Sequence, residues 1–197
     1  MITDKGAYKG WENWSGSLRF TPGHFARPAN EDEVVALVKR AKREKKILRP
    51  VGSGHSSSGI LETTDILVSL ENLSGLITCD PHRLTASFSP GTVLLEMNET
   101  LKAIKMAPPN LGDVALQTIG GAIATGTHGT GQKLRNLSAM LIGGRIVTGT
   151  GAVVTFSEEK TPGLLRALRV SLGVLGIFTE LRLRLLSAYT LRRQELF

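Results

Sequence analysis

The first regular feature of the chain is an amphipathic helix. Three acidic residues follow Asn30, and Glu33 stands where it completes a capping box. Apolar residues then recur at helical spacing, at Val34, Leu37, Val38 and Ala41. We therefore predict a helix that begins after Asn30 and ends near Lys45.

Two further helices are predicted downstream. An apolar stripe runs over 92–104, with Thr92 as its candidate N-cap and Gly91 as the bend before it. We assign this stripe to the hydrophobic core. The stretch from Pro162 to Leu172 is predicted as the third helix.

Short runs typical of β-strands lie between these helices. The runs 76–79 and 84–88 flank the turn-rich sequence 80–83, which predicts a hairpin. A second strand pair is expected over 139–147 and 152–156, and single strands over 47–51, 66–70 and 177–186. Hairpins and helices are mixed, without a strict βαβ repeat, so we predict an α+β fold with at least two sheet regions.

Glycine and small hydroxyl residues gather in two segments. The loop 52–59 reads G-S-G-H-S-S-S-G, and the later segment 118–131 contains T-I-G-G and T-G-T-H-G. Amides and hydroxyls of the first loop can turn toward one anion, such as a pyrophosphate. An ordinary Gly-Ser turn is the alternative. A Rossmann fingerprint is disfavoured, because His55 and serines stand where a helix should begin and the third glycine falls at Gly59.

Composition limits the class of protein. The 197 residues are 41% hydrophobic, enough for a core in one domain or in two small lobes. The 24 Lys and Arg residues against 17 Asp and Glu give a net charge of +7, which favours an anionic partner such as nucleic acid, acidic lipid or a diphosphate-bearing cofactor. Aromatic residues make up only 5%, and the spacing of known nucleic-acid-binding motifs is missing. We therefore expect no nucleic-acid partner.

Cysteine and histidine usage argue against disulfide and metal sites. Cys79 is the only cysteine, which excludes an intrachain disulfide and favours a reducing compartment. His24 and His82 have no partners at metal-ligand spacing, so we expect no metal. The first residues lack an apolar leader and the stretch 164–186 is broken by charges. A soluble, cytoplasmic protein without an integral membrane segment is expected.

The runs R-P-V-G-S-G-H-S at 49–56 and A-T-G-T-H-G-T-G at 124–131 occur in one chain, together with shorter pieces at 11–14, 27–28, 89–92, 110–113 and 171–177. In this order they resemble the PCMH-type FAD-binding domain of the vanillyl-alcohol oxidase superfamily. The likeness covers nearly the whole chain and is nearest to the aldonolactone (gulonolactone and arabinonolactone) oxidases and the alditol oxidases. It implies one FAD-binding domain over 1–197, with α+β subdomains at about 1–75 and 76–190 sandwiching the cofactor.

The same resemblance implies the cofactor site. His55 would be bonded through a ring nitrogen to the 8α-methyl group of FAD, and a neutral imidazole is a suitable nucleophile. A noncovalent contact is the alternative. The backbone of Ile177 would meet the adenine side. The expected cofactor-binding residues are Pro50, Val51, Gly52, Ser53, Gly54, His55, Ser56, Gly112, Asp113, Thr118, Gly121, Thr125, Gly126, Thr127, His128 and Ile177.

Three of these residues raise separate questions. Gly112 occupies the place where the family controls access of dioxygen to the flavin, and a residue without Cβ favours an oxidase over a dehydrogenase. Asp113 departs from the serine or alanine common there, and its role is left open. His128 is interpreted as a cofactor-packing or structural histidine in preference to a general base. We assign no catalytic residue.

The resembling enzymes carry a substrate domain after the FAD domain, and we expect it to be absent from this chain. No residue here is a candidate for holding an alcohol carbon or removing its proton. We therefore expect a flavin-dependent oxidoreductase for CH-OH groups of sugar lactones or alditols, incomplete without a separate substrate-domain polypeptide. Homodimerisation would also cover exposed apolar surface. The alternatives are a stand-alone flavoprotein and a non-catalytic FAD-binding or electron-transfer module.

Overall fold

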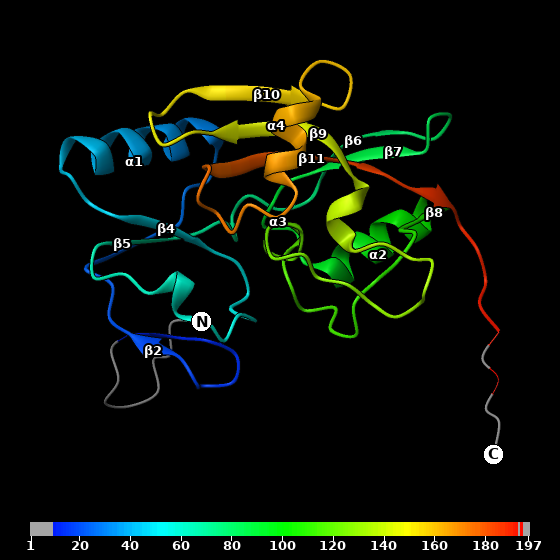
Figure 1. Ribbon diagram of the computed structural model, residues 1–197, viewed down its shortest axis with the longest axis horizontal. Coiled ribbons are helices and arrows are strands. Elements are labelled where there is room, and N and C mark those ends of the chain that lie inside the picture. Colours follow the sequence, from blue (N-terminus) through cyan, green and yellow to red (C-terminus); the bar gives the residue numbers. More distant parts are fainter. Residues whose placement is uncertain (1–9, 193, 195–197) are drawn as a thin grey trace.

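The computed structural model describes residues 10–192 and 194 and contains two main β-sheets (Figure 1). The smaller sheet is parallel, in the order β3-β5-β4, and consists of β3 (His24–Ala26), β4 (Leu48–Val51) and β5 (Ile66–Ser69). The larger sheet is antiparallel, in the order β10-β9-β11-β7-β6. Its strands are β6 (Leu76–Asp80), β7 (Thr85–Phe88), β9 (Leu141–Val147), β10 (Val153–Ser157) and β11 (Ile177–Arg184). The predicted α+β class is confirmed.

Helix α1 (Glu31–Arg43) forms where its cap and apolar stripe predict it. The Asn30 side chain accepts a hydrogen bond from the Glu33 amide at 2.9 Å, and the Glu33 carboxylate accepts one from the Ala29 amide at 2.8 Å. These bonds satisfy amides that the first turn leaves without helical partners. The buried face of the helix packs on the parallel sheet through Val34, Val38 and Ala41.

The start of α1 also connects the two sheets. The Glu31 carboxylate pairs with Arg145 of β9 and accepts a hydrogen bond from the Thr179 hydroxyl of β11 at 2.5 Å. Beneath these polar contacts, Val147 and Ile177 share one apolar cluster with the buried face of α1. The helix therefore holds the parallel sheet against the antiparallel one.

The predicted hairpin forms as β6 and β7, with Cys79 opposite Ala86. Helix α2 (Leu94–Ala103) follows, but Thr92 is not its cap and the prediction was wrong there. The Thr92 hydroxyl instead donates to the Ser89 carbonyl at 2.6 Å and holds the preceding turn. The first amides of α2 donate to backbone carbonyls of residues 115 and 117, so main-chain groups replace the side-chain cap.

Other boundaries differ from the expectations. Helix α4 (Pro162–Leu168) ends four residues before Leu172, which has a positive φ of 52°. The expected strand 177–186 is interrupted at Leu185, which is buried, and resumes as β12. Short elements that the pattern did not predict are β1 (Trp11–Glu12), β2 (Arg19–Phe20), β3, η1 (Gly59–Leu61), β8 (Met106–Ala107), α3 (Ile119–Ala124) and η2 (Leu137–Met140). Strand β12 (Leu186–Ser187) extends one residue past the expected strand.

The largest apolar cluster lies on the antiparallel sheet and fixes α2 and α3 there. Phe88 and Leu181 from the sheet meet Met97 of α2 and Ile119 of α3, and all four are completely buried. This packing holds the start of α3 in place against the end of the parallel sheet. No helix in residues 10–192 is long and apolar enough to cross a bilayer.

Replacing Phe88 with Ala tests this core. Phe88 is fully buried and stands opposite Leu181 in the sheet. Phe88→Ala is expected to lower the free energy of unfolding by about 3–5 kcal/mol, because it removes a buried ring and leaves a cavity. Urea titration followed by circular dichroism measures the loss. The control Ile77→Ala, at a side chain that is 45% exposed, should change it by less than about 0.5 kcal/mol; equal effects of the two would contradict this core.

Candidate functional site

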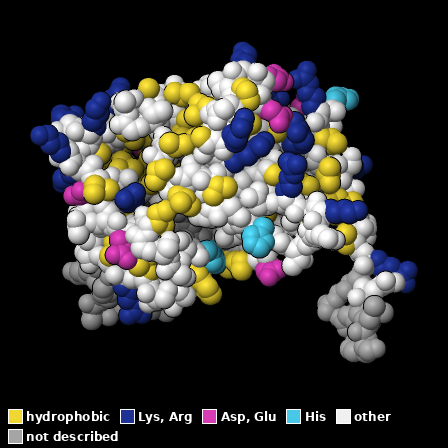
Figure 2. All heavy atoms as spheres, viewed as in Figure 1, with side chains coloured by type: hydrophobic (Ala, Val, Ile, Leu, Met, Phe, Trp, Pro, Cys, Tyr) yellow, Lys and Arg dark blue, Asp and Glu magenta, His cyan; other side chains and the backbone are white. Residues whose placement is uncertain are grey.

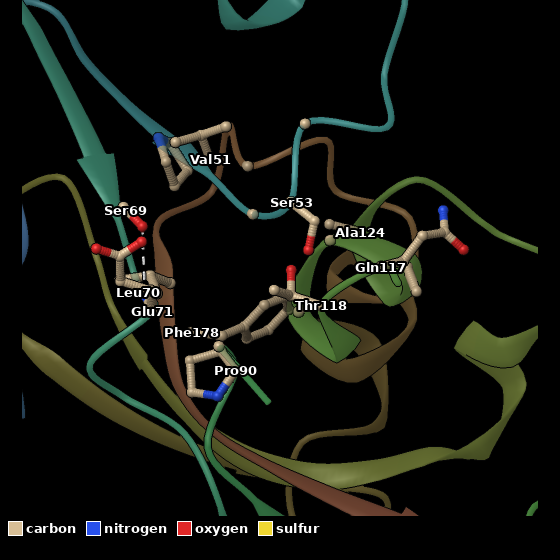
Figure 3. Close-up of a pocket in the computed structure, with 18 of the residues that line it drawn as sticks. Val51, Ser53, Ser69, Leu70, Glu71, Pro90, Gln117, Thr118, Ala124 and Phe178 are labelled. Carbon is tan, nitrogen blue, oxygen red and sulfur yellow. Dashed lines mark hydrogen bonds between the residues drawn. The ribbon is translucent and has the colours of Figure 1, made fainter. Parts of the chain in front are cut away.

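A cavity of about 630 Å³ lies where the parallel sheet meets α3 (Figure 3). Strands β4 and β5 end side by side, because Val51 is the register partner of Ser69. The backbone that follows each strand forms one side of the cavity, and the start of α3 with the segment 172–178 forms the other. A crevice at the carboxyl ends of parallel strands is a common place for a ligand.

The loop after β4 approaches α3 very closely. A Cβ atom at Gly52 would lie 2.1 Å from the Thr118 Oγ1 atom, which no side chain tolerates. The Ser53 and Thr118 side chains both point into the space between the loop and the helix in Figure 3. Glycine at position 52 therefore lets the loop lie against the Thr118 side chain, and hydroxyl groups are presented to the cavity beside it.

Residues near the start of the chain hold this loop in shape. Asn13 is 2% exposed, and its side-chain amide donates to the Ser56 carbonyl at 3.1 Å. The Trp14 amide donates to the Gly54 carbonyl at 3.0 Å. Gly54 has a φ of +74°, and a Cβ there would lie 3.0 Å from the buried Trp11 ring. The motif at 11–14 thus has a structural role, as the support of the loop 52–56.

His55 lies at the rim of the cavity and is partly buried. Its imidazole stacks on the Trp14 indole, with ring centroids 5.4 Å apart and planes inclined by 27°. Partial burial lowers the pKa of His55 below its ordinary value of 6.5, because desolvation disfavours the charged ring. The ring is therefore mainly neutral at neutral pH and has a nucleophilic nitrogen available.

The part of the lining that follows β3 and β5 contains residues that were not predicted as site residues. Arg27 follows β3 directly, pairs with Glu71 beyond β5, and lies with its guanidinium carbon 4.7 Å from the centre of the Phe25 ring. Ser74 donates to Glu96 at 3.4 Å nearby. All five line the cavity. The sequence analysis missed these residues because it did not predict β3. Without β3, it could not show that three parallel strands end at one edge of the sheet.

Electrostatics of the cavity differ from those of the whole chain. Arg27, Glu71 and Glu96 are the Lys, Arg, Asp or Glu residues that line it within the described part of the chain. In Figure 2 the Lys and Arg side chains gather over α1 and toward the opposite side, while the middle of the face consists mainly of uncharged atoms. The net charge of +7 is thus not concentrated at the cavity. An anionic ligand would be held chiefly by backbone amides and hydroxyls.

The structure brings together most of the predicted cofactor residues. Those that line the cavity are Pro50, Val51, Gly52, Ser53, Gly54, His55, Ser56, Thr118, Gly121, Thr125 and Ile177. Gly126 and His128 line a separate hollow with Arg135 and Arg169. Gly112, Asp113 and Thr127 line neither of these two spaces as described. The cofactor role of every residue in this set stays a prediction.

Two of the predicted cofactor residues that lie outside the cavity lining have contacts that explain their positions. A Cβ at Gly112 would lie 3.0 Å from the Thr127 Cγ2 atom, so Gly112 packs against the segment after α3. His128 is exposed, with its Nδ1 atom 2.9 Å from the Gly129 carbonyl oxygen. Neither contact requires a ligand. The contact of His128 with the Gly129 carbonyl is compatible with a structural role for this histidine.

Comparison with known proteins identifies the class. The model of the FAD binding domain family matches residues 22–157, and the chain belongs to this family. It is 34% identical over 185 residues to an L-gulono-1,4-lactone dehydrogenase of Mycobacterium tuberculosis, covering 94% of this chain and 42% of the relative. It is 32% identical to a D-arabinono-1,4-lactone oxidase of Eremothecium gossypii, covering 94% and 36%. The expected FAD cofactor and the resemblance to aldonolactone enzymes are confirmed.

Solved structures support the same fold. The 6-hydroxy-D-nicotine oxidase of Arthrobacter nicotinovorans superposes with a TM-score of 0.76 at 21% identity, covering 83% of this chain and 36% of that one. An alkyldihydroxyacetonephosphate synthase gives 0.74 at 22% identity, covering 83% and 31%. The chain thus spans less than half the length of these proteins and of the curated relatives it matches.

The cavity fits FAD. Its volume lies within the usual range for cofactor sites. Glycines at 52, 120, 121 and 173 line it, and a Cβ at Gly173 would already lie 3.0 Å from Pro50. Ser53, Thr118 and Thr125 add hydroxyl donors for a diphosphate, and His55 stands at the rim. FAD supplies a ring that accepts a hydride or electrons when it is bound.

Gly52→Ala tests the close approach of the loop. The new methyl group would contact Thr118 Oγ1, so we expect a loss of about 1–3 kcal/mol in unfolding free energy and weaker FAD binding. Adding Thr118→Ala removes the nearest atom and should restore part of the unfolding free energy. Gly149→Ala, which has open space around the Cβ position, is the control. Urea unfolding and flavin titration provide the two measurements; unchanged values for Gly52→Ala would refute the contact.

Proposed function

We propose that the chain is the FAD-binding part of an oxidoreductase that oxidises a CH-OH group of a sugar lactone or an alditol, and that it needs a substrate domain. The observation that carries this proposal is the glycine-lined FAD cavity with His55 at its rim, in a chain 34% identical to an L-gulono-1,4-lactone dehydrogenase. The residues that line the cavity include one histidine and two carboxylates, of which Glu71 is already paired with Arg27. A base acting on the alcohol is expected to come from outside this chain.

We further propose that the electron acceptor is dioxygen. The support is the family resemblance, in which Gly112 occupies the place that controls access of dioxygen to the flavin and a residue without Cβ favours an oxidase. In the structure Gly112 packs against Thr127 and does not line the cavity. The D-arabinono-1,4-lactone oxidase relative bears an oxidase name, and the L-gulono-1,4-lactone relative a dehydrogenase name. Gly112 favours the first of these alternatives.

The substrate domain is proposed to be supplied by further polypeptide, with a second copy of this chain as the alternative. Large apolar side chains are exposed on the segment beside the cavity: Val170, Leu172, Val174 and Leu175. Leu172 itself lines the cavity, so a covering partner would also shield the cofactor. We place the protein in the cytoplasm, because Cys79 is free and exposed, which suits a reducing compartment.

Flavin reduction tests the proposed activity. The purified chain loaded with FAD should show little or no bleaching when mixed anaerobically with L-gulono-1,4-lactone, D-arabinono-1,4-lactone or xylitol. The chain fused to the downstream part of the Mycobacterium tuberculosis relative should be bleached by at least one of them, and the downstream part alone is the control. Fast bleaching of the isolated chain would contradict its incompleteness. A folded, FAD-loaded fusion that none of the three reduces would contradict the substrate class.

We also propose that His55 bonds covalently to FAD. A ring nitrogen of His55 gives up its proton and bonds to the 8α carbon, which loses one hydrogen. The two protons and two electrons released pass to dioxygen as hydrogen peroxide, so the flavin ends oxidised. The support is the position of His55 at the cavity rim together with its neutral ring.

Acid precipitation measures this bond. Yellow colour and a mass increase equal to FAD less the two hydrogens lost should stay with precipitated wild-type chain, whereas His55→Ala should bind FAD but release it into the supernatant. The attachment rate should rise with pH and level off, with its midpoint below pH 6.5, because desolvation lowers the pKa of His55 and the neutral ring is the nucleophile. Asn110→Ala, away from the cavity lining, is the control. Release of all flavin from the wild type would contradict the bond, and a rate still rising above pH 7.5 would contradict attack by a neutral ring.

A further inference from the structure

An exposed tryptophan stands beside the cavity rim without an apolar pocket of its own. The Trp14 side chain is 65% exposed, whereas its neighbour Trp11 is 1% exposed and packs in a core cluster with Val51 and Leu67. The one aromatic partner recorded for Trp14 among the described residues is His55. Core packing therefore explains Trp11 but not Trp14.

The backbone on both sides of this ring pair is fixed. The Trp14 amide donates to the Gly54 carbonyl at 3.0 Å, one residue before His55. The Asn13 side chain donates to the Ser56 carbonyl at 3.1 Å, one residue after it, and also accepts from the Leu18 amide at 3.0 Å. These bonds hold the main chain on either side of His55, but they leave the two side-chain torsions of the imidazole undetermined.

Stacking on the indole supplies the missing restraint. With the centroids 5.4 Å apart and the planes 27° from parallel, the indole covers one face of the imidazole and excludes rotamers that would turn the ring through that volume. His55 also belongs to the cavity lining, so the indole restrains a ring that stands at the cavity. A nucleophile held in one orientation reacts faster than one that samples several.

We infer that Trp14 is a positioning residue, whose indole holds the His55 imidazole in the orientation from which a ring nitrogen bonds to FAD. The inference rests on the covalent link proposed above. Trp14 is not needed to hold the cofactor itself, since it does not line the cavity as described. Its effect should therefore fall on the rate of bond formation and not on the affinity for FAD.

The test compares three variants of the full chain purified without flavin from riboflavin-limited cells. Trp14→Ala should slow covalent attachment by about two- to tenfold, the range expected for loss of one aromatic pair. Trp14→Phe retains a flat ring and should attach FAD at close to the wild-type rate. Ile47→Ala, at another apolar side chain that is 55% exposed, is the matched control and should leave the rate unchanged. The rate is read from the intact mass over time after FAD is added.

Two further measurements separate positioning from binding and folding. In a His55→Ala background, which cannot form the bond, Trp14→Ala should leave the Kd for FAD unchanged. In the flavin-free chain, the His55 ring-proton NMR signals should lie upfield in the wild type and in Trp14→Phe, and should return toward ordinary positions in Trp14→Ala. Circular dichroism confirms that each variant is folded.

The outcomes distinguish this inference from the proposal on which it rests. A wild-type chain that binds FAD without ever forming the bond would overturn the covalent link and the role of Trp14 with it. Wild-type attachment together with an unchanged rate in Trp14→Ala would overturn the role of Trp14 alone. A higher Kd for FAD caused by Trp14→Ala in the His55→Ala background would also overturn the role of Trp14, because Trp14 would then contribute to cofactor binding.

Discussion

Close contact between chain segments, which glycines allow, is the constraint on which this cofactor site depends. A Cβ at Gly91 would lie 1.9 Å from the Leu70 carbonyl oxygen, and one at Gly52 would lie 2.1 Å from Thr118 Oγ1. These two glycines allow the turns after β5, before α2 and after β4 to converge on one cavity. Larger residues would push the walls apart, and the amides and hydroxyls on them would no longer face a single ligand.

The second property of the site is its lack of clustered positive charge. FAD carries a negatively charged diphosphate, yet the cavity lining contains Arg27, already paired with Glu71. Neutral donors can replace cations when they are fixed in place before the ligand arrives, because little reorganisation is then needed. The cores beneath β5 and α3 provide that fixation, since Val68 and Ile119 on either side are completely buried.

How much the sequence could predict depended on how local each signal was. The cap of α1 at Asn30 and the β6–β7 hairpin rest on residues close together in the chain, and both were predicted correctly. Helix α3 was missed because glycines at 120 and 121 have low helix propensity, and its stability comes from Ile119, Ala122 and Ile123 packing into the core. Strand β3 was missed because its three residues are half-exposed or exposed and its pairing partner β5 lies about forty residues away.

The site shows the same difference between local features, which the sequence predicts, and features that depend on long-range pairing, which it does not. The loop 52–56 was found from its glycines and histidine, and all of its residues line the cavity. The wall formed by Arg27 and Glu71 was not, because it exists only once β3 and β5 run parallel. Thr92 looked like a helix cap, but main-chain carbonyls from residues 115 and 117 occupy that role, which no local pattern reveals. Long-range pairing therefore accounts for what the sequence did not disclose.

The support that Asn13 gives to the loop has a consequence for protein design. The hydrogen bond from Asn13 to Ser56 spans 43 positions of the chain, and Trp11 lies against Gly54 from the same distant segment. The conformation of the loop 52–56 is thus determined partly by residues outside the loop. Grafting G-S-G-H-S onto another scaffold would transfer the chemical groups but not the contacts that fix their conformation. A graft that keeps the loop conformation would have to include both the loop and the segment 11–14.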